Sequence, residues 1–251
     1  MGRLGMGNRA LKACVMASAL AVGLWAVALW AAGCDTPLGI AKPAKSFNSS
    51  VAFDVYTVTG ARGNLVGSTP AQRALALPDC DWSVTPRAPV DMDKVRQEVQ
   101  FQEIPGLALR DSTDADLAHL KGLTALQRRD LSYTRVTDAG LVNLKGMSGL
   151  QCLNLEGTKV TDAGLACLKG LTALQQLSLG ATHIADGGLE CLKGLTALQR
   201  LDLSDTQVTD AGLVYLKGMK GLLWIDLMGT KVTDAGVGRM KAALPYVSVT
   251  R

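Results

Sequence analysis

The chain has 251 residues, of which 48% are hydrophobic, 19% charged and 4% aromatic, and its formal net charge is +4. This length suffices for one folded unit with appendages. Three of the positive charges, Arg3, Arg9 and Lys12, lie within the first 12 residues, and the chain beyond residue 33 is nearly neutral, with 23 basic and 22 acidic residues. It has no basic stripe that could neutralise phosphates, so we expect no nucleic-acid partner.

Residues 1–33 have the pattern of an export signal. A short basic start, residues 1–12, precedes residues 13–33, which contain no charged side chain. A basic start, an apolar run and small residues before a break are typical of a signal peptide. The apolar run ends in Leu29-Trp30-Ala31-Ala32-Gly33-Cys34, which resembles the lipobox of bacterial lipoproteins. This resemblance implies that Cys34 becomes the lipid-bearing first residue after cleavage.

Two other interpretations of the same segment stay open. A run of about 20 apolar residues is long enough to remain in the membrane as an uncleaved helix. Alternatively, an ordinary signal peptidase could cleave after Ala26-Val27-Ala28 and release a soluble protein. In each case the positive residues stay inside and the repeats end outside the cytoplasm. We therefore predict an extracytoplasmic protein of the cell envelope, anchored to the membrane by lipid or by an apolar helix, or secreted.

Residues 34–104 precede the regular part of the chain. Residues 34–50 are rich in Pro, Ser, Ala and Lys and are interpreted as a tether. In residues 51–104 we expect a strand near 51–58 and a short helix near 91–102, while 59–90 shows turn formers without a clear period. About 55 residues are too few for an independent enzyme domain. We interpret 51–104 as a poorly defined N-terminal collar over the first repeat.

Residues 105–251 contain a 24-residue sequence motif that is repeated almost identically five times. Its anchor, Leu-Lys-Gly, ends on Gly122, Gly146, Gly170, Gly194 and Gly218, and a degenerate copy follows as Met240-Lys241-Ala242. A fixed period between 20 and 50 residues indicates a stack of small supersecondary units rather than one globule with a pocket.

Each copy predicts a strand, a turn, a helix and a second turn. The pattern Leu153-x-Leu155 has period two and favours a strand with one buried face. The text T-D-A-G-L-x-x-L then changes to helical spacing. Thr161, Thr209 and Thr233 stand where a hydroxyl caps a helix N-terminus. The aspartates that follow the cap position suit the positive helix end: Asp138, Asp162, Asp186, Asp210 and Asp234.

The residues Leu150-x-x-Leu153-x-Leu155-x-x-Thr158-x-Val160 match the leucine-rich repeat signature. The phrase V-T-D-A-G-L resembles bacterial repeats similar to those of the ribonuclease-inhibitor type. The resemblance implies an α/β solenoid, a right-handed superhelix with short parallel strands on its concave face and helices on its convex face. It also implies a protein-binding surface, although such folds serve many specificities. Threonines stand where the family uses Asn or Cys to bond neighbouring turns: Thr134, Thr158, Thr182, Thr206 and Thr230.

Both ends of the stack depart from the pattern. Arg129 stands where the other copies place an inward Leu or Ile. A buried arginine needs a partner, so either the collar supplies a carboxylate or this strand is partly open to water. At the other end, residues 244–249 predict a final strand without a helix, because terminal units must close the core.

No residue pattern indicates catalysis or metal binding. The aspartate column recurs with the scaffold and has a structural explanation, and the chain lacks the nonapeptide pattern of calcium-binding solenoids. Neither His119 nor His183 lies in a nucleophile motif, and no phosphate loop is present. Cys167 and Cys191 hold equivalent places in consecutive copies, where helix axes about 8–10 Å apart disfavour a disulfide. We therefore expect no enzyme activity, no metal and no cofactor.

The candidate functional residues are those strand positions that face away from the core. These positions vary from copy to copy while the text around them repeats, and on a leucine-rich repeat they would line the concave face. The predicted ligand is a protein or peptide, or alternatively an envelope glycan, and the predicted contact residues are Arg128, Asp130, Asn154, Glu156, Gln176, Ser178, Arg200, Asp202, Trp224, Asp226 and Met228. Exposed aromatic residues beside arginines are common energetic centres of interfaces.

Three alternatives remain. Leu223, Trp224 and Met228 could contact the closing strand and seal the end of the stack. The whole stack could be a structural envelope spacer with no specific ligand. An enzymatic site in residues 51–104, around Asp79, Asp81 and Trp82, has no recognisable constellation to support it.

Overall fold

The computed structural model describes residues 46–47, 53–57, 65–68, 75–76, 82–86, 91–101, 104–109 and 111–251. The expected signal and Cys34 lie outside these residues. The chain forms two compact units, Met1–Trp82 and Ser83–Arg251. In the first unit, β1 (Ser46–Phe47) pairs antiparallel with β4 (Leu75–Ala76), and β2 (Phe53–Thr57) pairs antiparallel with β3 (Leu65–Ser68). The strand expected near 51–58 is β2.

Eight parallel strands lie side by side in chain order and form an unclosed sheet. Strands β7 to β11 follow one another at the 24-residue period, so equivalent positions of successive copies pair directly. The eight strands are β5 (Trp82–Pro86), β6 (Gly106–Ala108), β7 (Arg128–Asp130), β8 (Cys152–Asn154), β9 (Gln176–Ser178), β10 (Arg200–Asp202), β11 (Trp224–Asp226) and β12 (Ser248–Thr250). The predicted α/β solenoid with parallel strands is confirmed.

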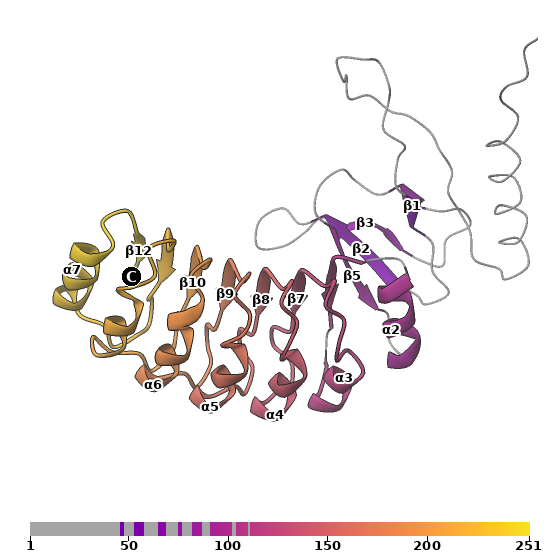
Figure 1. Cartoon of the computed structure of the whole chain (residues 1–251), viewed down its shortest axis with the longest axis horizontal. Helices are drawn as coiled ribbons and strands as arrows, with labels where there is room; N and C mark the ends of the chain where they lie inside the picture. Colours follow the sequence, from indigo (N-terminus) through magenta and orange to yellow (C-terminus); the bar gives the residue numbers. More distant parts are fainter. Residues whose placement is uncertain are drawn as a thin grey trace, which may run out of the picture. The chain divides into compact units, whose positions relative to one another are not determined.

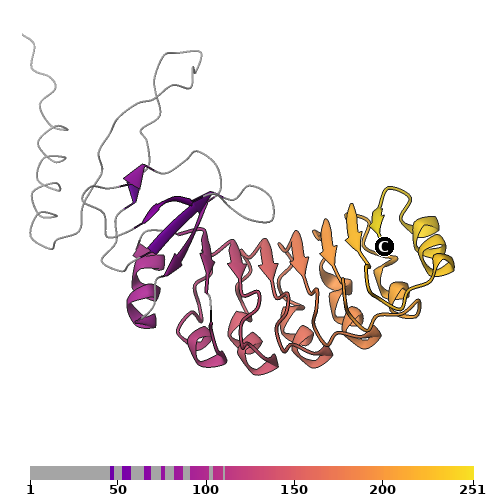
Figure 2. The same ribbon diagram turned by 180° about the vertical axis from the view of Figure 1, so that it is seen from behind.

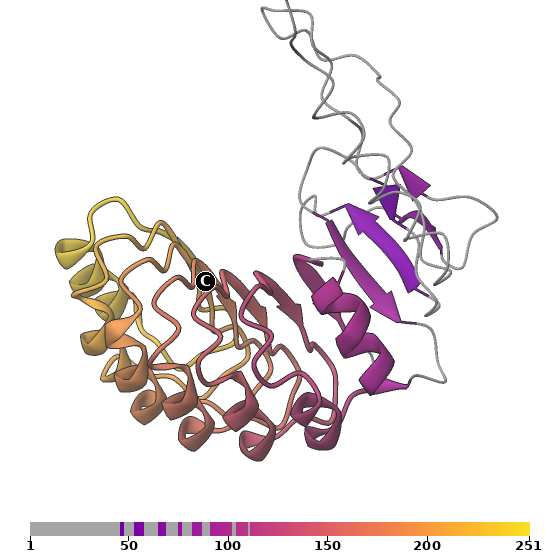
Figure 3. The ribbon, with the colours of Figure 1, turned by 45° about the vertical axis from the view of Figure 1, so that its right-hand side comes forward.

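Helical segments return the chain from each strand to the next and form the second layer (Figures 1 and 2). The α-helices are α2 (Met92–Phe101), α3 (Asp114–Ala118), α4 (Asp138–Leu141), α5 (Asp162–Leu165), α6 (Asp186–Leu189) and α7 (Asp234–Ala243). Short 3₁₀ segments follow the helices or replace them: η1 (Val142–Leu144), η2 (Ala166–Leu168), η3 (Glu190–Gly194) and η4 (Gly212–Leu216). In the stack, the strands line the inner side of the curve and the helices the outer side (Figures 1 and 3).

The helices are shorter than the spacing T-D-A-G-L-x-x-L suggests. In the middle copies a single α-turn continues as a 3₁₀ turn, as in α4 and η1. Few residues separate the threonine cap from the Leu-Lys-Gly stop, and a 3₁₀ turn tightens a helix end when little chain is available. The helix expected near 91–102 is α2, which is longer, with 10 residues.

The inward leucines form one continuous apolar core. Leu153, Leu177, Leu201 and Ile225 pair in register and are at most 2% exposed. Full burial of such a side chain contributes roughly 1.5–3 kcal/mol. Because each leucine is covered by its counterpart in the next copy, a single copy could not bury its own apolar face.

Aspartates join each helical turn to the following copy. The Asp138 carboxylate accepts hydrogen bonds from the backbone N–H of Thr161 at 2.8 Å and from its hydroxyl at 2.6 Å. We call this pair of bonds the Asp–Thr bridge; it recurs at Asp114–Thr137, Asp186–Thr209 and Asp210–Thr233. These bonds lower the pKa of Asp210. The structural role predicted for the aspartates is confirmed. The hydrogen-bond donors to these carboxylates, however, lie in the next copy.

The Asp–Thr bridge also explains the glycine of the phrase T-D-A-G. A Cβ at Gly164 would collide with the carboxylate of Asp138 in the preceding copy. The same collision would occur at Gly140 with Asp114. Glycine is therefore required for close approach between copies and not for a turn.

The threonine column after the strands bonds within each copy and not to neighbouring turns. The Thr134 hydroxyl donates to the carbonyl oxygen of Leu131 in its own copy at 2.6 Å. The same bond recurs at Thr158, Thr182, Thr206 and Thr230.

Arg129 is the exception in the core. It is 2% exposed, and its three guanidinium nitrogens have no hydrogen-bond partner within the described residues. The expectation of a strand partly open to water is wrong here, and the described part of the chain supplies no carboxylate partner. Burial lowers the pKa of Arg129 to about 10, against the opposing effect of the Asp130 carboxylate. The arginine therefore destabilises the stack.

Replacing Arg129 by leucine should stabilise the protein. The change removes a buried charge and restores the column formed by Leu107 and Leu153 on the neighbouring strands. We expect a gain of about 1–4 kcal/mol in the free energy of unfolding, measured by urea denaturation. Arg128→Leu, at the outward neighbouring position, should leave the midpoint nearly unchanged. A loss of stability in Arg129→Leu would show that the guanidinium has a partner.

A second stability prediction uses the one incomplete Asp–Thr bridge among α4 to α7. Ala185 donates its backbone N–H to Asp162 at 2.8 Å but has no hydroxyl. Ala185→Thr should add a bond to the free carboxylate oxygen and a cap for α6, raising stability by about 1 kcal/mol. The reverse change, Thr209→Ala, should lower it by a similar amount. Equal melting temperatures in wild type and both variants would contradict this role.

Candidate functional site

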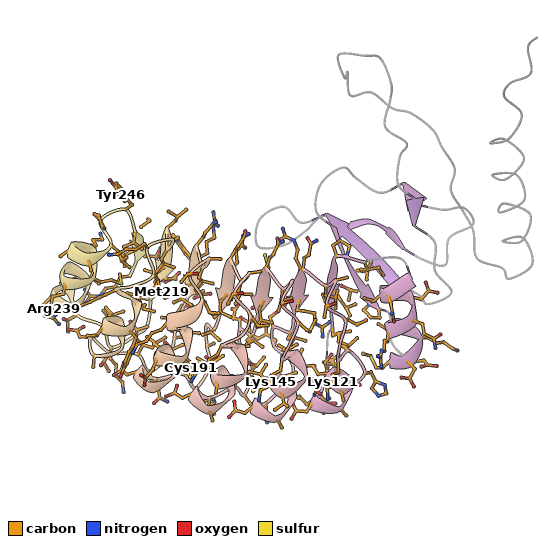
Figure 4. All side chains as sticks on the ribbon, viewed as in Figure 1. Lys121, Lys145, Cys191, Met219, Arg239 and Tyr246 are labelled. Carbon is orange, nitrogen blue, oxygen red and sulfur yellow. The ribbon has the colours of Figure 1, made fainter. Side chains whose placement is uncertain are left out.

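The candidate site is the outward face of strands β7 to β11. Strand residues alternate between the two faces of a sheet, so burial of the middle residue of each strand turns its two neighbours outward. The first outward column is Arg128, Cys152, Gln176, Arg200 and Trp224, and the second is Asp130, Asn154, Ser178, Asp202 and Asp226. A third column lies two residues beyond each strand: Ser132, Glu156, Gly180, Ser204 and Met228. All predicted contact residues belong to these columns. Figure 4 draws the side chains of the described residues on the ribbon of the stack.

Hydrogen bonds within the face hold the N-terminal part of these columns. Arg128 Nη1 donates to Cys152 Sγ at 3.1 Å, across neighbouring strands. Asp130 accepts from the backbone N–H and the hydroxyl of Ser132, at 3.0 and 2.7 Å. The Tyr133 hydroxyl donates to the carboxylate of Glu156. These side chains are therefore positioned by one another before any ligand binds.

Tyr133 is a residue of this face that the sequence patterns missed. Its side chain is 70% exposed. It occupies a turn position at which every copy from β7 to β11 has a positive φ, with Gly157, Ala181, Asp205 and Gly229 as the equivalents. The sequence signal was its variation from copy to copy, the same signal that marks the three outward columns.

The C-terminal part of the face carries two acidic side chains. Asp202 accepts from the Ser178 hydroxyl at 3.0 Å and from the Ser204 backbone N–H and hydroxyl at 2.9 and 2.7 Å. Asp226 accepts from the Met228 backbone N–H at 2.9 Å. Within the described residues neither carboxylate forms an ion pair.

An apolar cluster lies at the same end, formed by Leu223, Trp224 and Met228. Leu223 is 53% and Met228 52% exposed, and Trp224 is half-buried. The backbone of Leu223 does contact the closing strand, since its carbonyl oxygen accepts from Ser248 N at 2.8 Å. More than half of the Leu223 and Met228 side chains stays exposed beside this strand.

The remaining sequence candidates form no second site within the described residues. No group of three or more His, Cys, Asp or Glu side chains there could hold a metal ion. His183 is exposed, while His119 Nδ1 lies 2.8 Å from Asp93 Oδ1 and joins α3 to α2. Asp79 and Asp81, considered for an enzymatic site, lie outside the described residues, and of Trp82 only the backbone is described, as the start of β5.

The cysteines of the stack form no disulfide. Cys152, Cys167 and Cys191 are all reduced and partly exposed. The expectation that Cys167 and Cys191 do not form a disulfide agrees with this. The part of the chain that the structure describes also contains no helix long and apolar enough to cross a membrane.

Comparison with known proteins identifies the repeats. The model of the family described as Leucine Rich repeat matches residues 149–169 and 194–217. The chain carries leucine-rich repeats. The matched leucine-rich repeats include β8 with Asn154 and Glu156, and β10 with Arg200 and Asp202, so these candidate residues stand on recognised repeat units. No curated protein matches the chain.

Two solved structures resemble the leucine-rich repeat stack, both of internalins from Listeria monocytogenes. The internalin inlF is 20% identical, with a TM-score of 0.44, and the match covers 64% of this chain. The chain spans about half of that internalin, since 50% of it is covered. The internalin C2, inlC2, is 23% identical with a TM-score of 0.46, and the match covers 67% of this chain and 80% of that one. These likenesses say nothing about what the chain binds.

Proposed function

We propose that the chain is a protein- or peptide-binding module, and that its ligand lies on the outward face of β7 to β11. The observation that carries the proposal is the apolar group at one end of a mostly polar face, in which Leu223 and Met228 are just over half exposed and Trp224 is half-buried. Exposed apolar side chains rimmed by polar ones are typical of interaction sites. Among the residues that the structure describes, no arrangement of side chains supports an enzymatic function.

The dimensions of the face favour a short, extended ligand. Five strands about 4.8 Å apart give a length of roughly 20 Å, and the about five residues from the first to the third outward column give a width of roughly 15 Å. This area is well below the about 800 Å² per partner that stable protein complexes bury. A peptide segment or a single loop of a partner fits such a surface, and it would be held weakly unless anchored by a few strong contacts.

Photo-crosslinking tests whether this face binds a partner. A photoreactive amino acid at Gln176, which is exposed on the outward face, should give one dominant adduct when the full chain is expressed in its own cells. The same amino acid at Lys169, exposed on the helical side, serves as the matched control and should give none. Equal, diffuse labelling from both positions would favour the alternative of a structural envelope spacer without a specific ligand.

We propose further that the module is extracytoplasmic and tethered to the membrane. The support is the sequence pattern alone: a signal in residues 1–33, a lipid-bearing Cys34, a tether in 34–50 and a collar in 51–104 before the repeats of 105–251. A small binding face gains from such a tether, because anchoring raises the effective concentration of the module at the membrane.

The lipid anchor predicts a specific effect of Cys34→Ser in the full chain. Metabolic labelling with radioactive palmitate should mark the wild-type protein and leave the variant unlabelled. The variant should also lose the size shift caused by cleavage before residue 34. Membrane retention of an unlabelled wild-type protein would indicate the uncleaved apolar helix instead, and its appearance in the medium would indicate secretion.

A further inference from the structure

Two aspartates occupy neighbouring positions at the C-terminal part of the binding face. Asp202 and Asp226 are paired in register on the neighbouring parallel strands β10 and β11, where backbones lie about 4.8 Å apart. Like charges opposite each other destabilise a sheet. Both side chains are half-buried, and the described residues provide no cation for either. The pair is therefore an uncompensated negative charge.

The turn at Asp226 does not need a charge. The hydrogen bond that Asp226 accepts from Met228 N at 2.9 Å is made equally well by Asn154, which accepts from Glu156 N at 3.0 Å. In the preceding pair of strands, the same column holds the uncharged Asn154 and Ser178 in register. An amide would satisfy the turn without the repulsion, so the second carboxylate has a role outside the stack.

Apolar side chains flank the carboxylate pair on the same face. Along β11 the outward residues are Trp224, then Asp226, then Met228, so an acidic group lies between two apolar ones. A lysine or arginine has matching chemistry, because its aliphatic stem covers apolar surface while its charged end reaches a carboxylate. Arginine also gains attraction from the face of a tryptophan ring.

One cation of the chain lies nearby and opposes such a ligand. Arg200 is exposed and pairs in register with Trp224, one column away from the two aspartates. It forms no ion pair with Asp202. Its removal should therefore affect a basic ligand in the opposite direction from removal of the aspartates.

Resting on the proposed function, we infer that the partner presents an extended segment in which a lysine or arginine is flanked by apolar residues. Its cation lies between Asp202 and Asp226, and its apolar neighbours cover Trp224 and Met228. The charge complementarity excludes acidic segments from this end of the face. The repeat of apolar and charged positions along β11 sets the spacing of the partner's own residues.

The test is selection of a displayed library of random peptides against the immobilised full chain. Wild type should enrich peptides with Lys or Arg between apolar residues. The double variant Asp202→Asn, Asp226→Asn, which keeps the turn bonds as Asn154 does, should lose this enrichment. With the best peptide, labelled with a fluorophore, the double variant should raise Kd at least about tenfold, and Arg200→Gln should leave Kd equal or lower. Added sodium chloride should weaken binding.

Other outcomes separate the two proposals. Selected peptides that crosslink from Gln176 but carry no basic residue would overturn the inference and leave the proposed function intact. Peptides that crosslink only from Lys169, or the absence of any enriched peptide, would overturn both. If a chelator abolished binding, the carboxylate pair would bind a divalent cation instead. If the double variant still enriched peptides with Lys or Arg, the basic side chain of the peptide would bind elsewhere on the chain.

Discussion

The packing of each inward leucine on its counterpart 24 residues later is the contact on which the structure depends. Leu177 lies between Leu153 and Leu201, and none of the three is more than 2% exposed. The strand ladder fixes this contact at the inner layer, and the Asp–Thr bridge fixes it at the outer layer. Because helical turns are wider than strands, two layers held in the same register must curve toward the strands, as the stack does (Figure 3).

This constraint decides where a ligand could bind. Every inward position is occupied by the contact between copies, and the helical turns are occupied by caps, bridges and close glycine contacts. The outward strand positions can change without disturbing the stack, and there the copies differ. Variation at Gln176 or Trp224 therefore carries information that the constant leucines do not. The same freedom allows Asp226 to keep a carboxylate where an amide would serve the turn.

The sequence predicted the period, the strand positions and the curved two-layer arrangement, because leucine spacing alone determines them. It did not predict the partner of Asp138, since a first-turn carboxylate already has a local explanation and its bond to Thr161 spans 23 residues. One copy did contain an indication of this contact. In it, Ala185 replaces the threonine at the cap position, and the sequence that follows is D-G-G instead of D-A-G. The left-handed turn at Tyr133 was not predicted from that residue, since tyrosine disfavours a positive φ, although the equivalent positions Gly157 and Gly229 are glycines. Where a residue already had an explanation within its own copy, its contact with the next copy was not predicted.

Arg129 and the Asp202–Asp226 pair show two different consequences of a charge without a partner. The guanidinium is enclosed between apolar strands, so it cannot meet a ligand and acts only on stability. The aspartates are half-buried on an open face, where water moderates their repulsion and a cation can approach. The repulsion between the two aspartates is therefore weak enough for the fold to tolerate. A bound basic side chain would remove it. Part of the binding free energy is then relief of repulsion already present in the free protein, which favours a ligand with one well-placed cation over one with a larger contact area.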